Sequence, residues 1–162
     1  MYSKSLGRGN RLIKTSLFPY RLAHQCHQEA IYLGIGGNIG DTKRLFTKLF
    51  WYLKRDRFID VVATSPILKN PPFGYEAQED FHNAVIHVGS RLPPQQLLRH
   101  LLRIEKHFGR KRSFANAPRT LDIDMLFYGK RVIQSKSLTL PHPHWHSRDF
   151  VVIPLSKLKE RR

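Results

Sequence analysis

The chain has 162 residues, which is the size of one domain and too short for two independent hydrophobic cores. With 41% hydrophobic and 11% aromatic residues it belongs with globular rather than disordered proteins, and no apolar run approaches the roughly 20 residues of a membrane-spanning helix. A formal net charge of +16 favours an anionic partner, but charge alone does not distinguish polyphosphates, RNA and acidic membranes.

Residues 1–30 form a basic segment that differs from the rest of the chain. Before the first acid, Glu29, it carries Lys4, Arg8, Arg11, Lys14 and Arg21, and it has no continuous apolar block of the secretory type. We interpret it as an N-terminal extension, either ordered or a loosely attached arm, with an organelle-targeting peptide as the alternative. The sole cysteine, Cys26, excludes an internal disulfide and a cysteine-based zinc site, and predicts a reducing, cytoplasmic location.

Residues 31–162 are expected to form the domain, and their first half predicts a strand, a helix and a second strand. Residues 31–35 read as a strand that ends in a glycine turn, and Asp41 is the expected N-cap of the helix. The expected buried face of that helix consists of Leu45, Leu49, Tyr52 and Leu53. Residues 58–68 predict a strand rich in Val, Ile and Thr, and residues 69–80 are a loop because of their Pro and Gly content.

The second half repeats the pattern. Residues 81–90 predict a strand, Pro93 and Pro94 open a helix, and Gly109 ends it. The expected buried stripe of this helix is Leu97, Leu101, Ile104 and Phe108. A basic loop, a strand at 121–128, a hairpin turn with a return strand at 128–133, an irregular polar segment at 140–150 and a last short element follow. This order predicts an α+β, ferredoxin-like (βαββαβ) antiparallel sheet with both helices on one face, plus a C-terminal appendage.

The strand "TLDIDMLFY" places two acids on one face. Strict alternation sends Leu121, Ile123, Met125 and Phe127 to one side and Asp122, Asp124, Leu126 and Tyr128 to the other. The two aspartate Cα atoms are then roughly 6.6 Å apart, at about 3.3 Å per residue, so their carboxylates can converge on a shared cation. Mg²⁺ held by carboxylates and substrate phosphates is the natural candidate, and a solvated strand face neutralised by Arg119 is the plainer alternative.

A cluster of bases next to these acids favours the first interpretation. Arg110, Lys111, Arg112 and Arg119 lie on and after the basic loop, where guanidinium groups can bind phosphate oxygens in pairs. Carboxylates, basic side chains and a loop at one end of a strand together predict a site for a nucleotide polyphosphate. Without the aspartates, a solvated loop or an RNA contact would explain the cluster as well.

Two further motifs are weaker. "GIGGNIGD" lacks the Gly-Lys-Ser/Thr of a phosphate-binding P-loop and has Ile39 where a dinucleotide fingerprint needs glycine. We expect its glycines to play a structural role, by allowing a close backbone approach or a positive φ beside a ligand, and Asn38 to make a local hydrogen bond. In "PHPHWH", a zinc site made of His142, His144 and His146 is improbable next to two prolines, and one histidine near phosphate is the better hypothesis.

Taken in order, "GRKR", "PRTLDID", "LPHP" and "RDF" resemble the 6-hydroxymethyl-7,8-dihydropterin pyrophosphokinase family of the folate pathway, from about residue 31 to residue 158. The resemblance implies the ferredoxin-like fold and transfer of a diphosphate from ATP, with two Mg²⁺ ions, to the hydroxymethyl group of the pterin. It implies small-molecule substrates, no nucleic acid or membrane partner, and a monomer.

The resemblance also implies roles for individual residues. Asp122 and Asp124 look like the metal-binding carboxylates, with Asp124 the nearer candidate to assist the hydroxyl group. The residues that look like nucleotide contacts are Arg110, Arg112, Arg119, His142 and Arg148, of which the first three are also similar to the catalytic arginines. The residues that look like pterin contacts are Asn83, Phe81, Phe150 and Pro72. The loops at residues 69–80 and 109–118 are expected to close over the substrates and exclude water.

The chain departs from the family pattern in two places. It has Gly37 where many relatives have serine, and Ala115, Asn116 and Ala117 where they often have an Arg-Trp pair and a glycine, on a loop one residue shorter. The missing arginine and tryptophan motivate one alternative, a catalytically impaired homologue that binds ATP and pterin. A small basic RNA-binding protein is the other, although "KRVIQSKS" and its neighbouring strands lack the aromatic consensus of RNA-binding sheets.

Overall fold

The computed structural model describes residues 2–23, 29–111 and 113–160. The strands are β1 (Tyr2–Gly7), β2 (Asn10–Lys14), β3 (Tyr20–Arg21), β4 (Ile31–Gly37), β5 (Ile59–Thr64), β6 (Ile67–Asn70), β7 (Phe81–Ser90), β8 (Asp122–Tyr128), β9 (Ile133–Gln134) and β10 (Thr139–Leu140). The helices are α1 (Thr42–Lys54), α2 (Pro94–His107) and α3 (Asp149–Lys159), with a 3₁₀ turn η1 (Trp145–Ser147). Within these described ranges, no helix is long and apolar enough to cross a membrane.

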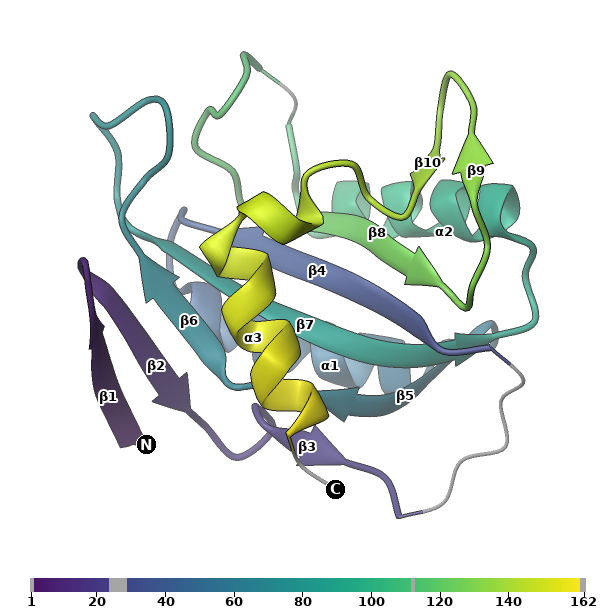
Figure 1. Cartoon of the computed structure of the whole chain (residues 1–162), viewed down its shortest axis with the longest axis horizontal. Helices are drawn as coiled ribbons and strands as arrows, with labels where there is room; N and C mark the ends of the chain where they lie inside the picture. Colours follow the sequence, from purple (N-terminus) through teal and green to yellow (C-terminus); the bar gives the residue numbers. More distant parts are fainter. Residues whose placement is uncertain (1, 24–28, 112, 161–162) are drawn as a thin grey trace.

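Eight strands form one antiparallel sheet around the long strand β7 (Figure 1). β7 pairs with β4 on one side and with both β5 and β6 on the other. β8 lies beyond β4 at one edge, while β2 and β1 continue the sheet beyond β6 and β3 pairs with β5. The protein is therefore α+β, as the sequence predicts.

Helices cover both faces of this sheet. α1 and α2 pack on one face, where Phe46, Leu49 and Leu101 join a large core with alternate residues of β4, β7 and β8. α3 crosses the opposite face, where Val151, Leu155 and Leu158 pack on Val85 and Leu126 (Figure 1). The site described below lies on the face that carries α3.

Both helices of the main core begin and end largely as the sequence predicts. The Asp41 carboxylate caps α1 by accepting the Arg44 N–H at 3.0 Å, and Pro94 opens α2. Gly109 follows α2 with φ +83°, a conformation that suits glycine after a helix. The expected buried face of α1 is wrong at Tyr52, which is exposed, because Phe46 and Phe50 turn toward the sheet instead.

The single strand expected at residues 58–68 is two strands. Ser65 and Pro66 interrupt it, since proline has no N–H to donate to a neighbouring strand. Ser65 compensates, because its N–H donates to the Val85 carbonyl at 2.9 Å and its hydroxyl accepts the Val85 N–H at 2.9 Å. Both halves therefore stay beside β7.

Strict alternation also fails at the end of β8. Ile123 and Met125 face the main core as expected, but the pairing with β4 shifts register at this end of the strand. Phe127 consequently packs with the α3 cluster, and Tyr128 joins the main core, the reverse of the expectation. The extra residue of a β-bulge reverses the faces of all residues beyond it. Asp122 and Asp124 precede the shift and keep their common face.

The two ends of the chain are more ordered than the sequence indicates. The first segment is not a loosely attached arm, because β2 pairs with β6 and its Leu12 and Ile13 are buried. The last short element is the eleven-residue helix α3, which contains Pro154. The return strand β9 pairs with β10 in a separate two-stranded sheet rather than with β8.

The core position of the first segment predicts a large effect of Phe18→Ala. Phe18 is fully buried against Phe46 and Phe50, so truncation should lower the free energy of unfolding by about 3–5 kcal/mol. Denaturant unfolding measures this, with the exposed Tyr2→Ala as control, for which less than about 0.5 kcal/mol is expected. Equal, small effects of both variants would show that the segment does not contribute to the core.

Candidate active site

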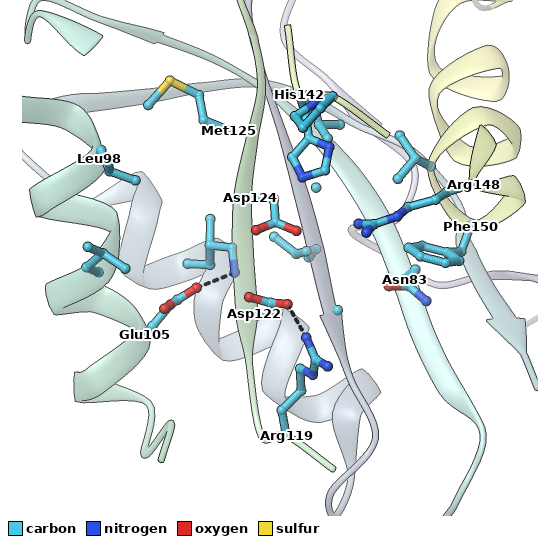
Figure 2. A pocket seen from close by; sticks show the side chains of 18 of the residues that line it. Asn83, Leu98, Glu105, Arg119, Asp122, Asp124, Met125, His142, Arg148 and Phe150 are labelled. Atoms are coloured by element: carbon cyan, nitrogen blue, oxygen red, sulfur yellow. Dashed lines mark hydrogen bonds and ion pairs between the residues drawn. The ribbon is translucent and has the colours of Figure 1, made fainter. Parts of the chain in front are cut away.

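A cavity of about 570 Å³ gathers most of the predicted site residues (Figure 2). Its wall includes nine of them: Asp122, Asp124, Arg110, Arg119, Asn83, Phe81, Phe150, His142 and Arg148. Pro72 is not on this wall, whereas its neighbour Phe73 is, and the pterin contact expected of Pro72 stays a prediction. Arg112 lies outside the described residues.

The floor of the cavity is set by the register of three strands. Gly36 of β4 pairs with Asp122 on one side and Asn83 on the other, and Gly34 pairs with Asp124. Residues paired in this way share a face, so both carboxylates and the Asn83 amide point into one space. A side chain at Gly36 would collide with the Asn83 carboxamide. The glycines of "GIGG" thus leave room beside each acid, the close approach that the sequence suggests.

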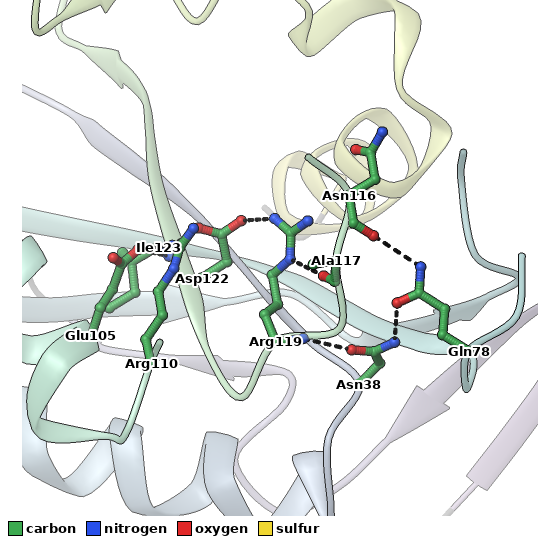
Figure 3. Close-up of polar contacts among 9 residues, drawn as sticks. All are labelled: Asn38, Gln78, Glu105, Arg110, Asn116, Ala117, Arg119, Asp122 and Ile123. Atoms are coloured by element: carbon green, nitrogen blue, oxygen red, sulfur yellow. Dashed lines mark hydrogen bonds and ion pairs between the residues drawn. The ribbon is translucent and has the colours of Figure 1, made fainter. Parts of the chain in front are cut away.

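Asp122 is held by two arginines. One carboxylate oxygen accepts from the Arg110 guanidinium, and the other accepts from Arg119 Nη1 at 2.6 Å (Figure 3). Arg119 is itself oriented by a bond from its Nε to the Ala117 carbonyl at 3.2 Å. The loop arginines therefore converge on the strand end where the sequence places them.

Asp124 has no such partner. In the described ranges it forms neither a hydrogen bond nor an ion pair with another side chain. Burial, and then the neighbouring charge of Asp122, raise the pKa of Asp124 from 3.8 to about 6, although Arg148, Arg110 and Arg119 oppose the rise. An ionised Asp124 thus has cationic neighbours but no bonded cationic partner in the described ranges, and it suits a bound cation.

Glu105 is a functional residue that sequence reasoning missed. It projects from α2 at 3% exposure, and its Oε1 accepts the Ile123 N–H at 2.7 Å and Arg110 Nη1 at 2.7 Å (Figures 2 and 3). Burial raises the pKa of Glu105 to about 7 against the lowering effect of these two bonds. Glu105 thereby accepts a backbone N–H at the outer edge of β8, and it orients Arg110. Its position four residues after Leu101, within a buried stripe, was the available signal.

Aromatic and histidine side chains complete the cavity. The Arg119 guanidinium lies 5.6 Å from the centroid of the Phe81 ring, and that of Arg148 lies 5.7 Å from the Phe150 ring. The His142 N–H donates to the Leu126 carbonyl at 2.9 Å, which fixes this segment to the edge of β8. Burial, followed by the charge of Arg148, lowers the pKa of His142, so the ring is neutral near pH 7.

Asn38 connects the two loops that border the cavity (Figure 3). Its Oδ1 accepts the Arg119 N–H at 2.9 Å, and its Nδ2 donates to Gln78 Oε1 at 2.9 Å and to the Glu79 carbonyl at 2.9 Å. Gln78 Nε2 continues the network to the Asn116 carbonyl at 3.0 Å. Sequence reasoning assigned Asn38 only a local bond and did not select Gln78.

Comparison with known proteins decides the family. Residues 32–160 match the model of the 7,8-dihydro-6-hydroxymethylpterin-pyrophosphokinase family. The chain belongs to this family. It is similar to the 2-amino-4-hydroxy-6-hydroxymethyldihydropteridine pyrophosphokinases of Helicobacter pylori (38% identity over 143 residues, 87% of this chain and 86% of that protein) and Campylobacter jejuni (40% over 126 residues, 78% and 80%). The enzyme of that name from Aquifex aeolicus is 37% identical over 129 residues, covering 80% of this chain and 79% of that protein. The resemblance seen in the sequence is thereby confirmed.

The different surroundings of the two aspartates predict opposite stability effects of Asp124→Asn and Asp122→Asn. The folded-state pKa of Asp124, about 6, exceeds its unfolded value, so its ionisation destabilises the fold progressively as pH rises from about 4 to 6 and fully above that. Asp124→Asn should therefore raise the free energy of unfolding at pH 8 by about 1–3 kcal/mol and have little effect near pH 4. Asp122→Asn should lower it by about 1–2 kcal/mol, because two arginines lose their charged acceptor.

Urea unfolding at pH 4 and pH 8 measures both effects without any ligand. A loss of stability in Asp124→Asn at pH 8 as large as that in Asp122→Asn would contradict the unpaired state of Asp124.

Proposed function

We propose that this chain transfers the diphosphate of ATP to the hydroxyl of 6-hydroxymethyl-7,8-dihydropterin and releases AMP, in folate biosynthesis. Membership of the pyrophosphokinase family supports the reaction, and one geometric observation carries it. Asp122 and Asn83 flank the same glycine, Gly36, and open into one cavity. Asp122, which would hold the metal-bound phosphates, is thus adjacent to Asn83, which would hold the heterocycle. A direct transfer between two substrates needs such proximity.

Asp122 and Asp124 fit a magnesium site. Their carboxylates share a face, and Asp124 is a largely desolvated acid with no cationic partner bonded to it in the described ranges. No group of three or more acidic, His or Cys side chains in the described ranges is placed to hold a metal, so substrate phosphates and water would supply the remaining ligands. We expect two ions, and when bound they neutralise charge that develops on the phosphate oxygens.

The arginines bind the polyphosphate. Arg110 and Arg119 now neutralise Asp122, and cations on the carboxylates would free both guanidinium groups to turn toward phosphate oxygens. His142 and Arg148 line the same cavity on its other side and serve the nucleotide. Arg112 belongs to this set through the resemblance alone.

The pterin binds on the Asn83 side. Asn83 Nδ2 donates to Asn70 Oδ1 at 2.7 Å, which fixes the carboxamide so that it can hydrogen-bond a heterocycle. Phe81 and Phe150 provide aromatic faces in the same cavity for ring stacking, and the exposed Phe73 ring lies at its wall.

The chemistry requires no covalent intermediate with the protein. The pterin hydroxyl oxygen forms a bond to the β-phosphorus of ATP, the bond from that phosphorus to the α,β-bridging oxygen breaks, and AMP leaves with the bridging oxygen. The hydroxyl proton is lost in the process, and Asp124 is the carboxylate to which the resemblance assigns assistance of the hydroxyl group. The protein mainly positions the substrates and compensates charge.

The loops at residues 69–80 and 109–118 close over the substrates. Both lie at the same end of the sheet's central strands (Figure 1), and the bonds of Asn38 and Gln78 join them. Contact between the Tyr75 and Phe114 rings, 5.4 Å apart, adds an apolar link where the family's usual tryptophan is missing. Closure excludes water, which would otherwise compete with the pterin hydroxyl.

We infer three further properties. The strand order β8-β4-β7 followed by β5 and β6, with α1 and α2 on one face, supports the ferredoxin-like topology for the sheet's central strands. The anionic phosphates of the nucleotide provide the anionic partner that the net charge of +16 favours, so we expect no binding of nucleic acid. We also expect a monomer. A cytoplasmic location remains the expectation from the single cysteine.

The decisive assay supplies ATP, Mg²⁺ and the hydroxymethyl dihydropterin and measures AMP. We expect AMP only when both substrates are present, and a loss of at least about 100-fold in kcat in Asp122→Ala and Asp124→Ala. Glu160→Ala, an exposed acid at the end of α3, is the matched control and should retain the rate. ATP binding without AMP formation would indicate a catalytically impaired homologue. Salt-sensitive retention of RNA, without ATP binding or AMP formation, would indicate an RNA-binding protein.

The contact between Gly36 and Asn83 predicts a coupled effect on the pterin. Gly36→Ala should raise the KM for pterin about 10-fold, because the new methyl group displaces the Asn83 carboxamide. Asn83→Ala should do the same, and the double variant should be no worse than Asn83→Ala alone, since the collision is then absent. Steady-state kinetics of the two single variants and the double variant measure this. Additive effects on the pterin KM would show that Gly36→Ala does not act through Asn83.

A further inference from the structure

The first three strands lie before the part of the chain that matches the family model, yet they contact elements of the pterin side of the cavity. The match covers residues 32–160, whereas β1, β2 and β3 span residues 2–21. In the sheet, Leu12 of β2 pairs with Leu68 of β6, and Leu68 pairs with Asn83 of β7. β6 is therefore an interior strand with a neighbour on each side, and one row of paired residues runs from Leu12 through Leu68 to Asn83.

The tip of the β1–β2 hairpin rests on the loop that follows β6. Gly9 has φ +75°, and a Cβ atom built on it would lie 2.7 Å from Pro71 Cγ. The Pro71 carbonyl accepts Asn70 Nδ2 at 2.9 Å, and Asn70 Oδ1 in turn accepts Asn83 Nδ2 at 2.7 Å. A continuous set of contacts thus runs from the hairpin tip to the amide that we assign to the pterin.

β3 contacts the opposite wall of the cavity through α3. Arg21 Nη2 donates to the Leu158 carbonyl at 2.7 Å, in the last turn of α3, where a cation is favourable. The other end of α3 carries Arg148 and Phe150 into the cavity. β3 itself is fixed by pairing with β5 and by the Tyr20 ring, 5.0 Å from that of Phe50.

We propose that residues 2–21 act as a clamp that positions the two walls of the pterin site, Asn83 on one side and Phe150 on the other. Gly9 and Arg21 are its two points of contact, and both are positioning residues that touch no substrate. The proposal rests on the proposed function, because it names the pterin as the substrate whose binding the clamp supports. Loss of preorganisation at such a wall weakens binding of the group held there more than binding elsewhere.

Two glycines of the same hairpin provide a matched test. Gly7 and Gly9 have φ +81° and +75°, so alanine is strained at both, but only Gly9 has an atom within 4 Å of the added methyl group. Gly9→Ala should raise the KM for pterin about fivefold relative to Gly7→Ala, with the KM for ATP equal in the two variants. Adding Pro71→Ala to Gly9→Ala removes the ring atoms that collide and should restore the pterin KM.

Arg21 tests the second contact independently. Arg21→Ala should raise the pterin KM, whereas Arg21→Lys, which keeps a donor and a charge, should largely retain it. Thermal unfolding of each variant separates this effect from a general loss of stability, because a merely structural role would lower stability without a difference between the two KM values.

The results distinguish the clamp from the reaction itself. Equal pterin KM values for Gly9→Ala and Gly7→Ala, together with no effect of Arg21→Ala, would overturn the clamp while leaving the function intact. No AMP from the wild-type chain in the same assay would instead remove the proposed function, and the clamp with it.

Discussion

Two carboxylates project from one face of β8, and arginine side chains form bonds with only one of them. Arg110 and Arg119 bond Asp122, whereas Asp124 is buried nearby without a partner in the described ranges. The remaining features of the site follow from this arrangement. Glycines stand opposite both acids to leave room for a ligand, and buried Glu105 holds the arginine that could move from carboxylate to phosphate. A metal-bound nucleotide would supply positive charge to the Asp124 carboxylate, which has no bonded cationic partner in the described ranges.

Much of this architecture could be predicted from the sequence, because the decisive interactions are local. Asp41 caps the first helix, the two apolar stripes orient α1 and α2, and the alternation in β8 places Asp122 and Asp124 together. The motifs around them identified the family, and the cavity gathers nearly all of the residues selected from those motifs.

What the sequence did not reveal depends on contacts between distant segments. The first strands contain many polar and basic residues, and the pairing of β2 with β6 and of β3 with β5 makes them part of the sheet. α3 contains Pro154 and has no polar face of regular period, so its burial against β7 and β6 decides that it is a helix. The bulge in β8 reverses Phe127 and Tyr128 through the pairing with β4. Glu105 and Gln78 gain their roles from partners 18 and 38 residues away.

The most direct measurement is a crystal structure of the chain with Mg²⁺, a non-hydrolysable ATP analogue and the pterin. We predict cations between the phosphates and the carboxylates of Asp122 and Asp124, guanidinium groups of Arg110 and Arg119 turned to the phosphates, and the pterin hydroxyl facing the β-phosphorus beside Asn83. Cations bound away from both aspartates, or a pterin outside this cavity, would contradict the central claim.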